Sequence, residues 1–172
     1  NSPLIKGGNS NGKRPSSPQL RPQESSTTWV ERAITYVTKA NSLDMSGHKL
    51  TAIPPEILKF LEENKATIKL NELSIYGNRF EAGLPPFFLT QMDASSLAVL
   101  DISCNNMKQL DAAFLKKCTS LKRFVASFNS FSNFPVEELK ELKTLTVVYQ
   151  TNCLLFTDLF FIYLFDIIRL FD

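Results

Sequence analysis

The sequence has little of the side-chain chemistry that enzymes and metal sites use. It contains one histidine, His48, and three cysteines, Cys104, Cys118 and Cys153, among 172 residues. The cysteines form no CxxC pair and no zinc-ligand spacing occurs, while a Ser-His or Cys-His nucleophile pair would depend on His48 alone. We therefore expect no catalytic, metal-binding or cofactor-binding residues, and a protein that is not an enzyme on its own.

An odd number of scattered cysteines is atypical of a small secreted domain, which uses an even, closely spaced set. We therefore expect free thiols in a reducing compartment. Charge of one sign is also scarce, because 19 Lys and Arg are balanced by 17 Asp and Glu, leaving +2. This excess is too small to indicate a nucleic acid or a membrane surface as the partner. The composition favours a protein that binds other proteins.

Residues 1–27 contain few apolar residues and are rich in Asn, Ser, Gly, Pro and Gln. Such a segment buries too little apolar surface to offset the entropy of ordering it, so we expect a disordered, basic and Ser-Pro-rich tail. Residues 7–13 match the phosphate-binding pattern GxxxxGK, but Arg14 stands where Ser or Thr would hold magnesium, and no predicted strand precedes the loop. We interpret residues 7–13 as a flexible linker.

The character of the sequence changes at Thr28. Trp29, Ala33 and Val37 recur at i, i+4 and i+8, with further apolar residues beside them. This is an apolar stripe at helical spacing. We expect a helix over 28–41 that covers the open end of the repeats that follow, because terminal repeats need a cap.

Residues 42–150 repeat an apolar pattern close to L-x-x-L-x-L-x-x-N-x-L. Equivalent positions in four copies are occupied by Leu43, Met45, His48 and Leu50; by Leu70, Leu73, Ile75, Asn78 and Phe80; by Leu97, Leu100, Ile102, Asn105 and Met107; and by Leu121, Phe124, Ala126, Asn129 and Phe131. A fifth copy begins with Leu142, Leu145 and Val147, and the pattern breaks at Gln150. The segments between the copies predict helices over 55–64, 86–94, 111–118 and 136–142.

This pattern resembles the leucine-rich repeat family over residues 42–150, with about 4.5 copies of the repeat. The resemblance implies an α/β fold, a solenoid with a short parallel β-sheet on its concave face and helices or loops on its convex face. L-x-x-I-P-x-x-I at 50–57, and F-x-x-F-P at 131–135 followed by Leu139, look like the intracellular subclass found in Ras-pathway scaffolds. The resemblance therefore implies a cytoplasmic protein-binding module for signalling or scaffolding, with a small GTPase, a phosphatase or a kinase as the kind of partner.

That subclass also occurs in repeat regions attached to enzymes. A second interpretation is therefore that the chain is the regulatory end of a larger enzyme, a protein kinase or a metal-dependent serine/threonine phosphatase.

The polar position of each repeat has a physical role. Each L-x-L is a short strand with alternate residues pointing inward, and the Asn follows where the chain turns. Its amide both donates and accepts, so it can satisfy backbone groups of neighbouring turns. We expect a structural ladder of His48, Asn78, Asn105 and Asn129, in which the His48 ring serves the first turn.

The outward positions of the strands form the face that a partner would contact. Interfaces favour Tyr and Arg as anchors, so we expect Tyr76, Asp101 and Arg123 to carry binding, with Asp44 and Glu72 steering the partner. The full set of expected binding residues is Asp44, Glu72, Ser74, Tyr76, Asp101, Ser103 and Arg123. The alternative is that this strip is ordinary solvated surface.

Residues 151–172 form an apolar tail with three open interpretations. A membrane span needs about 20 apolar residues, and Asp158, Asp166 and Arg169 oppose it. A helix with its charges in one sector could close the end of the solenoid or lie on a membrane, although it has few basic residues for the latter. The third interpretation, which we favour slightly, is a sequence never selected to fold, because Phe, Leu, Ile, Tyr and Asp are what translated AT-rich non-coding DNA would give. We expect no membrane contact unless this tail is genuine.

Overall fold

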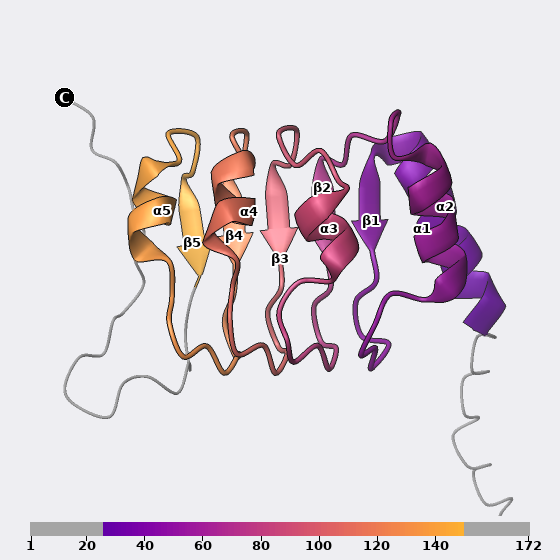
Figure 1. The fold of residues 1–172 in the computed structure, drawn as a ribbon. Coiled ribbons are helices and arrows are strands. Elements are labelled where there is room, and N and C mark those ends of the chain that lie inside the picture. The colour runs from indigo at the N-terminus through magenta and orange to yellow at the C-terminus, as the bar shows by residue number, and fades with distance from the viewer. Residues whose placement is uncertain (1–25, 150–172) are drawn as a thin grey trace, which may run out of the picture.

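The computed structural model describes residues 26–149 (Figure 1). Helices and strands alternate along this part of the chain. Their bounds are α1 Ser26–Ala40, β1 Ser42–Asp44, α2 Pro55–Asn64, β2 Glu72–Ser74, α3 Pro86–Thr90, β3 Val99–Asp101, α4 Ala112–Lys117, β4 Arg123–Val125, α5 Val136–Glu141 and β5 Val147–Tyr149.

The five strands form one parallel sheet in the order in which they occur along the chain. Their central residues are in register, and these are Leu43, Leu73, Leu100, Phe124 and Val148. A parallel connection must leave the sheet and return, and here each connection passes through a helix. The coarse prediction of an α/β chain with a short parallel sheet is therefore confirmed.

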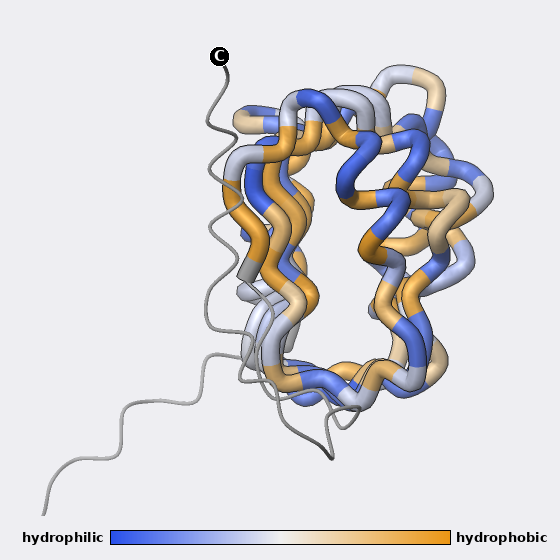
Figure 2. The backbone as a smooth tube through the Cα atoms, turned by 90° about the vertical axis from the view of Figure 1, so that its left-hand side faces the viewer, coloured by the Kyte–Doolittle hydropathy of each residue, from blue (hydrophilic) through white to orange (hydrophobic). Residues whose placement is uncertain are grey.

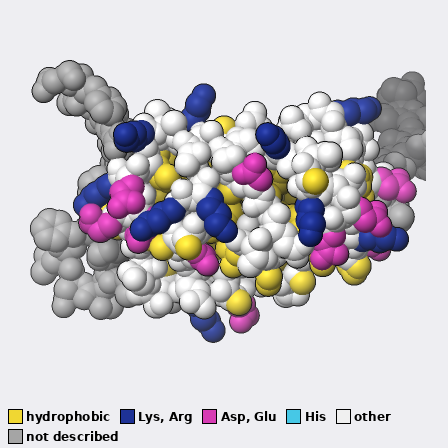
Figure 3. All heavy atoms as spheres, turned by 45° about the horizontal axis from the view of Figure 1, so that its top comes forward, with side chains coloured by type: hydrophobic (Ala, Val, Ile, Leu, Met, Phe, Trp, Pro, Cys, Tyr) yellow, Lys and Arg dark blue, Asp and Glu magenta, His cyan; other side chains and the backbone are white. Residues whose placement is uncertain are grey.

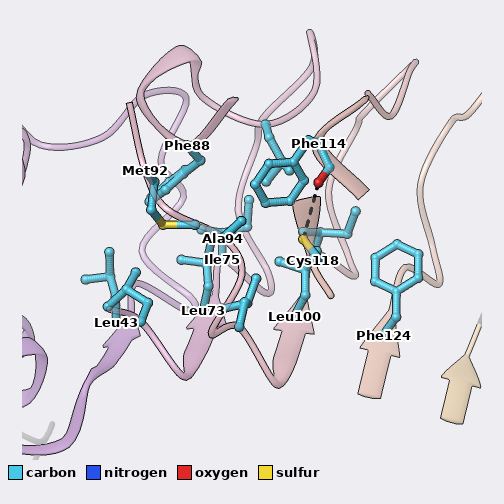
Figure 4. Packing of buried hydrophobic residues seen from close by; sticks show 14 of the residues in the cluster. Leu43, Leu73, Ile75, Phe88, Met92, Ala94, Leu100, Phe114, Cys118 and Phe124 are labelled. Atoms are coloured by element: carbon cyan, nitrogen blue, oxygen red, sulfur yellow. Dashed lines mark hydrogen bonds between the residues drawn. The ribbon is translucent and has the colours of Figure 1, made fainter. Parts of the chain in front are cut away.

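Helices α2 to α5 lie on one side of the sheet, and α1 lies beside β1 at the end of the row (Figure 1). The described chain therefore has two layers. Figure 2 shows the strand layer and the helix layer as separate walls, joined by loops at both ends. In Figure 4, Leu43, Leu73, Leu100 and Phe124 point from the strands toward side chains of the helix layer, among them Phe88 and Phe114. The core therefore lies between the two walls.

The core is continuous from α1 to β5. Leu43, Leu73, Leu100 and Phe124 are fully buried. Met45 and Ile75, which directly follow β1 and β2, are fully buried as well. Burying a side chain of this size stabilises the fold by about 1.5–3 kcal/mol. Because each strand contributes only three residues, no strand can bury its own apolar side, and stability depends on the row as a whole.

The outer helices begin where the sequence indicates. Pro55 and Pro86 occupy the first turns of α2 and α3, where the missing N–H costs nothing. The carboxylate of Asp111 accepts the Phe114 N–H at 2.9 Å and caps α4. The helix predicted over 55–64 is confirmed at its bounds. The others are shorter than expected: 86–94 ends at Thr90, 111–118 covers Ala112–Lys117, and 136–142 covers Val136–Glu141.

Helix α1 begins at Ser26, two residues before the start predicted from the apolar stripe. Val30, Ala33 and Val37 are buried, and the helix contacts β1 and α2. Trp29, expected in the same stripe, is only partly buried, because it lies at the edge of this contact.

The predicted alignment of the fifth copy is wrong by three residues. Val147 pairs with Arg123 and Val148 with Phe124, whereas the repeat consensus aligns Leu145 with Phe124. The predicted alignment would make Thr144 and Thr146 outward residues of the fifth strand, but both precede Val147, where β5 begins. With the observed register, the position equivalent to Asn129 lies 24 residues later, at Cys153 and not at Gln150; Cys153 is outside the described residues.

The disorder of the N-terminal tail, the linker at 7–13 and the three interpretations of 151–172 fall outside residues 26–149. Within the described residues, no helix has the length and apolar character needed to cross a bilayer.

Candidate functional site

The outer side of the sheet is the candidate site. Successive side chains of a strand point to opposite sides, so the residues that flank the buried ones point away from the helix layer. Within residues 26–149 no helix covers this side (Figure 2). We call this surface the open face; its residues are Asp44, Ser46, Glu72, Ser74, Tyr76, Val99, Asp101, Ser103, Arg123, Val125 and Ser127.

The structure places all seven predicted binding residues on the open face, with unequal exposure. Asp44, Glu72, Tyr76 and Arg123 are exposed, whereas Ser74 and Asp101 are partly buried. Ser103 is only 5% exposed, so it offers a partner little surface, and its role as a contact residue stays a prediction. The Ser103 hydroxyl donates instead to the Asp101 carboxylate, which is the reason it turns away from solvent.

The two aspartates of the open face also have a local structural role. Oδ1 of Asp44 accepts the Ser46 N–H at 2.9 Å, and Oδ1 of Asp101 accepts the Ser103 N–H at 2.9 Å. The Ser46 and Ser74 hydroxyls lie 2.7 Å apart and join β1 to β2. These hydrogen bonds hold each carboxylate beside the end of its strand, so a partner would meet oriented charges.

Charge on the open face changes sign along the sheet. Asp44, Glu72 and Asp101 belong to β1, β2 and β3, and Arg123 begins β4. Between Glu72 and Arg123, the same register position is Val99. The surface is therefore acidic over three strands and basic on the fourth. The part of the molecule drawn in Figure 3, by contrast, shows Lys and Arg interspersed with Asp and Glu.

Two exposed aromatic residues lie at the strand ends beside this face. Tyr76 is 46% exposed and Phe128 is 52% exposed. Phe128 was missed by sequence reasoning, because it follows the last outward position of its repeat. The usable signal was its place in the repeat: the equivalent turn positions in the first two copies are Gly47 and Gly77, and all three have positive φ.

The asparagine ladder lies behind these turns and is buried. Nδ2 of Asn105 donates to Ile75 O and Ile102 O at 2.9 and 3.1 Å, while Oδ1 accepts the Phe80 N–H at 3.1 Å. Asn78 and Asn129 repeat this arrangement one copy earlier and one copy later. Each amide thus joins two turns through both its donor and its acceptor, as the sequence analysis expects.

His48 does not fill the first ladder position as predicted. Its backbone N–H donates to Oδ1 of Asn78 at 3.2 Å, but its ring is exposed and stacks on Trp29, with centroids 3.8 Å apart and planes inclined by 11°. The reason is its place at the end of the described row, where the first repeat is preceded by α1 and not by another repeat. The ring instead joins α1 to the first turn.

The two described cysteines are free and differ in environment. Cys118 is buried, its Sγ lies 3.4 Å from Phe114 O as a donor, and burial raises the pKa of its thiol to about 12. Cys104 is partly buried at the turn after β3. A pocket of about 590 Å³ is lined by Gln109, Leu110, Ala112 and residues 132–138. Among the described residues, no group of three His, Cys, Asp or Glu is placed to hold a metal ion.

The fold and the site define a class of protein, a row of short parallel strands backed by helices with an uncovered outer face. Comparison with protein-family models and with curated proteins finds no match to this chain. Any assignment to a family must therefore be argued from the repeat itself.

Proposed function

We propose that this chain is a leucine-rich repeat solenoid that binds a partner protein through its open face, without catalysis of its own. The support is the repeat. Leu43, Leu73, Leu100, Phe124 and Val148 follow one another at 30, 27, 24 and 24 residues, close to the 20–29 residues typical of that family. Each repeat contributes one strand, an outer segment and, in three copies, a buried asparagine.

One observation carries the binding function. The inward side of the strands is uniformly apolar, whereas the outward side changes from residue to residue and carries exposed Tyr76 and Arg123. Inward uniformity is what packing requires, but packing sets no such requirement on the outward residues. Tyr and Arg are enriched among residues that dominate binding energy. An uncovered sheet face with such side chains fits a protein interface.

The remaining parts of the proposal follow from the resemblance. Helix α1 acts as the cap of the first repeat, since its buried Val30, Ala33 and Val37 join the core where the helix contacts β1 and α2. The two described free thiols suit a cytoplasmic protein. The partner class we propose is a signalling protein, such as a small GTPase, a phosphatase or a kinase.

The test is differential capture by the full 172-residue chain. Wild type, Tyr76→Ala and Arg123→Glu are immobilised and exposed to cytosolic extract, and bound proteins are quantified by mass spectrometry. Tyr36→Ala is the matched aromatic control, because Tyr36 is 55% exposed on α1. Lys59→Glu is the charge control on α2. Circular dichroism verifies that every variant is folded.

We expect a partner that wild type and both controls capture equally, and that Tyr76→Ala and Arg123→Glu each capture at least tenfold less. Tenfold corresponds to about 1.4 kcal/mol, a modest loss for an interface anchor. Unchanged capture by both open-face variants would contradict the proposal.

A further inference from the structure

Three stretches of chain lie side by side where β2, β3 and β4 end. The Gly77 N–H donates to Ser103 O at 3.1 Å, and the Cys104 N–H donates to Ser127 O at 2.9 Å. The hydrogen bonds align the pairs 76–77, 103–104 and 127–128. We call this the strand-end rim; it has Tyr76 on one side and Phe128 on the other.

The two aromatic residues flank the middle strand. Neighbouring strands lie about 4.8 Å apart, so the outer stretches of the rim are separated by about 10 Å. A cation within about 6 Å of a ring centroid is attracted by the ring. A flat cationic group over the middle stretch would lie about one strand spacing, roughly 5 Å, from the backbone of each aromatic residue, and the two side chains are 46% and 52% exposed.

The middle strand supplies a carboxylate to this position. Oδ1 of Asp101 accepts both the N–H and the hydroxyl of Ser103, and among the described residues Oδ2 has no hydrogen-bond partner. Asp44 lies at the same register position as Asp101, two strands away on β1, whereas Glu72 shares the register position of Arg123 at the opposite end of the strands. Arg123 lies at the opposite end of β4, four residues before Ser127, or about 13 Å along the strand. The rim therefore attracts a cation.

The backbone at Phe128 adds a separate argument. Its φ is +57°, a conformation that the equivalent Gly47 and Gly77 adopt at no steric cost and that Cys104 adopts in the third copy, with φ +53°. A bulky residue in this region is uncommon, and an exposed ring gains nothing from the core. Phe128 is thus better explained by contact with a partner than by folding.

We propose that the strand-end rim binds an arginine side chain of the partner protein. The guanidinium group is planar, stacks on aromatic rings and donates to carboxylates, which matches Tyr76, Phe128 and Oδ2 of Asp101. This inference rests on the proposed function, since it names the chemistry that the partner presents to the open face.

The experiment uses two neutral-ended tripeptides, acetyl-Gly-Arg-Gly-amide and its citrulline analogue, which keeps the shape and removes the charge. Each is titrated into the full chain labelled with 13C in its Tyr and Phe rings. The signals of Tyr76 and Phe128 are assigned from the variants Tyr76→Leu and Phe128→Gly. We expect both rings to shift with the arginine peptide and at least fivefold weaker binding of the citrulline peptide.

Asp101→Asn tests the charge of the carboxylate alone, because an amide oxygen can still accept the Ser103 N–H while the charge is lost. We expect Asp101→Asn to weaken binding of the arginine peptide at least fivefold. Asn106→Ala, at an exposed neighbouring turn, should leave binding of this peptide unchanged. Equal shifts with both peptides, or no shift of Tyr76 and Phe128, would overturn the inference. If that occurs while Tyr76→Ala still abolishes protein capture, the inference fails alone and the proposed function stands.

Discussion

The buried asparagine at a turn between repeats makes several hydrogen bonds with a single side chain. Asn105 donates to Ile75 O, Ile102 O and Ser103 O, and accepts the Phe80 N–H. It is 4% exposed, so water cannot replace the amide if it is removed. Leaving a buried polar group unsatisfied costs about 1–3 kcal/mol, and several groups depend on this one side chain.

We predict that Asn105→Ala lowers the free energy of unfolding by at least about 3 kcal/mol. Urea denaturation followed by circular dichroism measures this change. The matched control is Asn106→Ala at the next position, which is exposed and should change stability by no more than about 0.5 kcal/mol. Equal effects of the two substitutions would contradict the assigned role of the ladder.

The buried thiol makes stability depend on alkaline pH. Burial raises the pKa of Cys118 from 9.0 to about 12, so the unfolded chain loses this proton at a lower pH than the folded chain. The contribution is full below pH 9 and falls as the pH rises toward 12. One pKa unit corresponds to 1.36 kcal/mol, so the loss across this window is at most about 4 kcal/mol.

We predict that wild type loses more stability between pH 9 and 11 than Cys118→Ala does, measured by urea denaturation at each pH. The comparison of the two chains cancels the contribution to stability of the Tyr and Lys residues that titrate in the same pH range. In parallel, Cys104 should react with iodoacetamide faster than Cys118 at pH 8. Parallel pH profiles of the two chains would show that the thiol is not responsible.

At the scale of elements, the strands and outer helices were predictable because their signals are local. Apolar residues at two-residue spacing place β2 and β3, and the pair Pro54-Pro55 sets the start of α2. The shorter helices were overestimated, because buried Met92 and Ala94 continue an apolar pattern after α3 has ended. Sequence periodicity reports burial, and burial does not require a helix.

The register of the fifth strand could not be read from the sequence. Leu142, Leu145 and Val147 fit the consensus, and so do Leu145 and Val148 three residues further on. The structure decides through hydrogen bonds: Leu145 N–H donates to Leu142 O, as Leu121 N–H donates to Cys118 O one copy earlier. Leu142 therefore corresponds to Cys118, a position before the consensus begins.

The candidate face was predictable in part. Outward alternation identified Asp44, Glu72, Tyr76 and Arg123, which are exposed. It could not identify Phe128, which belongs to a turn, nor the burial of Ser103, which follows from a hydrogen bond to Asp101. Those features depend on backbone geometry at strand ends, where period-two alternation stops.

The attachment of α1 to the first turn gives a prediction that separates two roles for His48. If its ring stabilises by stacking on Trp29, then His48→Asn should be as destabilising as His48→Ala, by about 0.5–1.5 kcal/mol, and His48→Phe should retain most of the stability. Trp29 is the single tryptophan, so its fluorescence reports the contact directly. Full retention of stability by His48→Asn, with loss in His48→Phe, would favour the ladder role instead.

At the scale of the molecule, the contacts between elements join near neighbours along the chain. Each strand pairs with the next one, α1 contacts β1 and α2, and α4 contacts α5. The last repeat is slightly less covered than the middle, since Leu142 and Val148 are 6% and 8% exposed while Leu100 is fully buried. In an array of this kind, stability is close to a sum over repeats and their interfaces, so its ends should open before its centre.

Two leucine substitutions test this difference. Leu100→Ala removes a side chain from the middle of the row and should lower the free energy of unfolding by about 2–5 kcal/mol. Leu142→Ala should lower it by an amount at the low end of that range or below it. Amide hydrogen exchange shows where each chain opens. We expect Leu142→Ala to speed exchange of the Val147 N–H, which bonds to Lys122 O, and to leave the Met45 N–H, which bonds to Ser74 O, unchanged. Exchange that accelerates equally at both amides would mean that residues 26–149 open as one cooperative unit, and that the repeats do not act as separable layers.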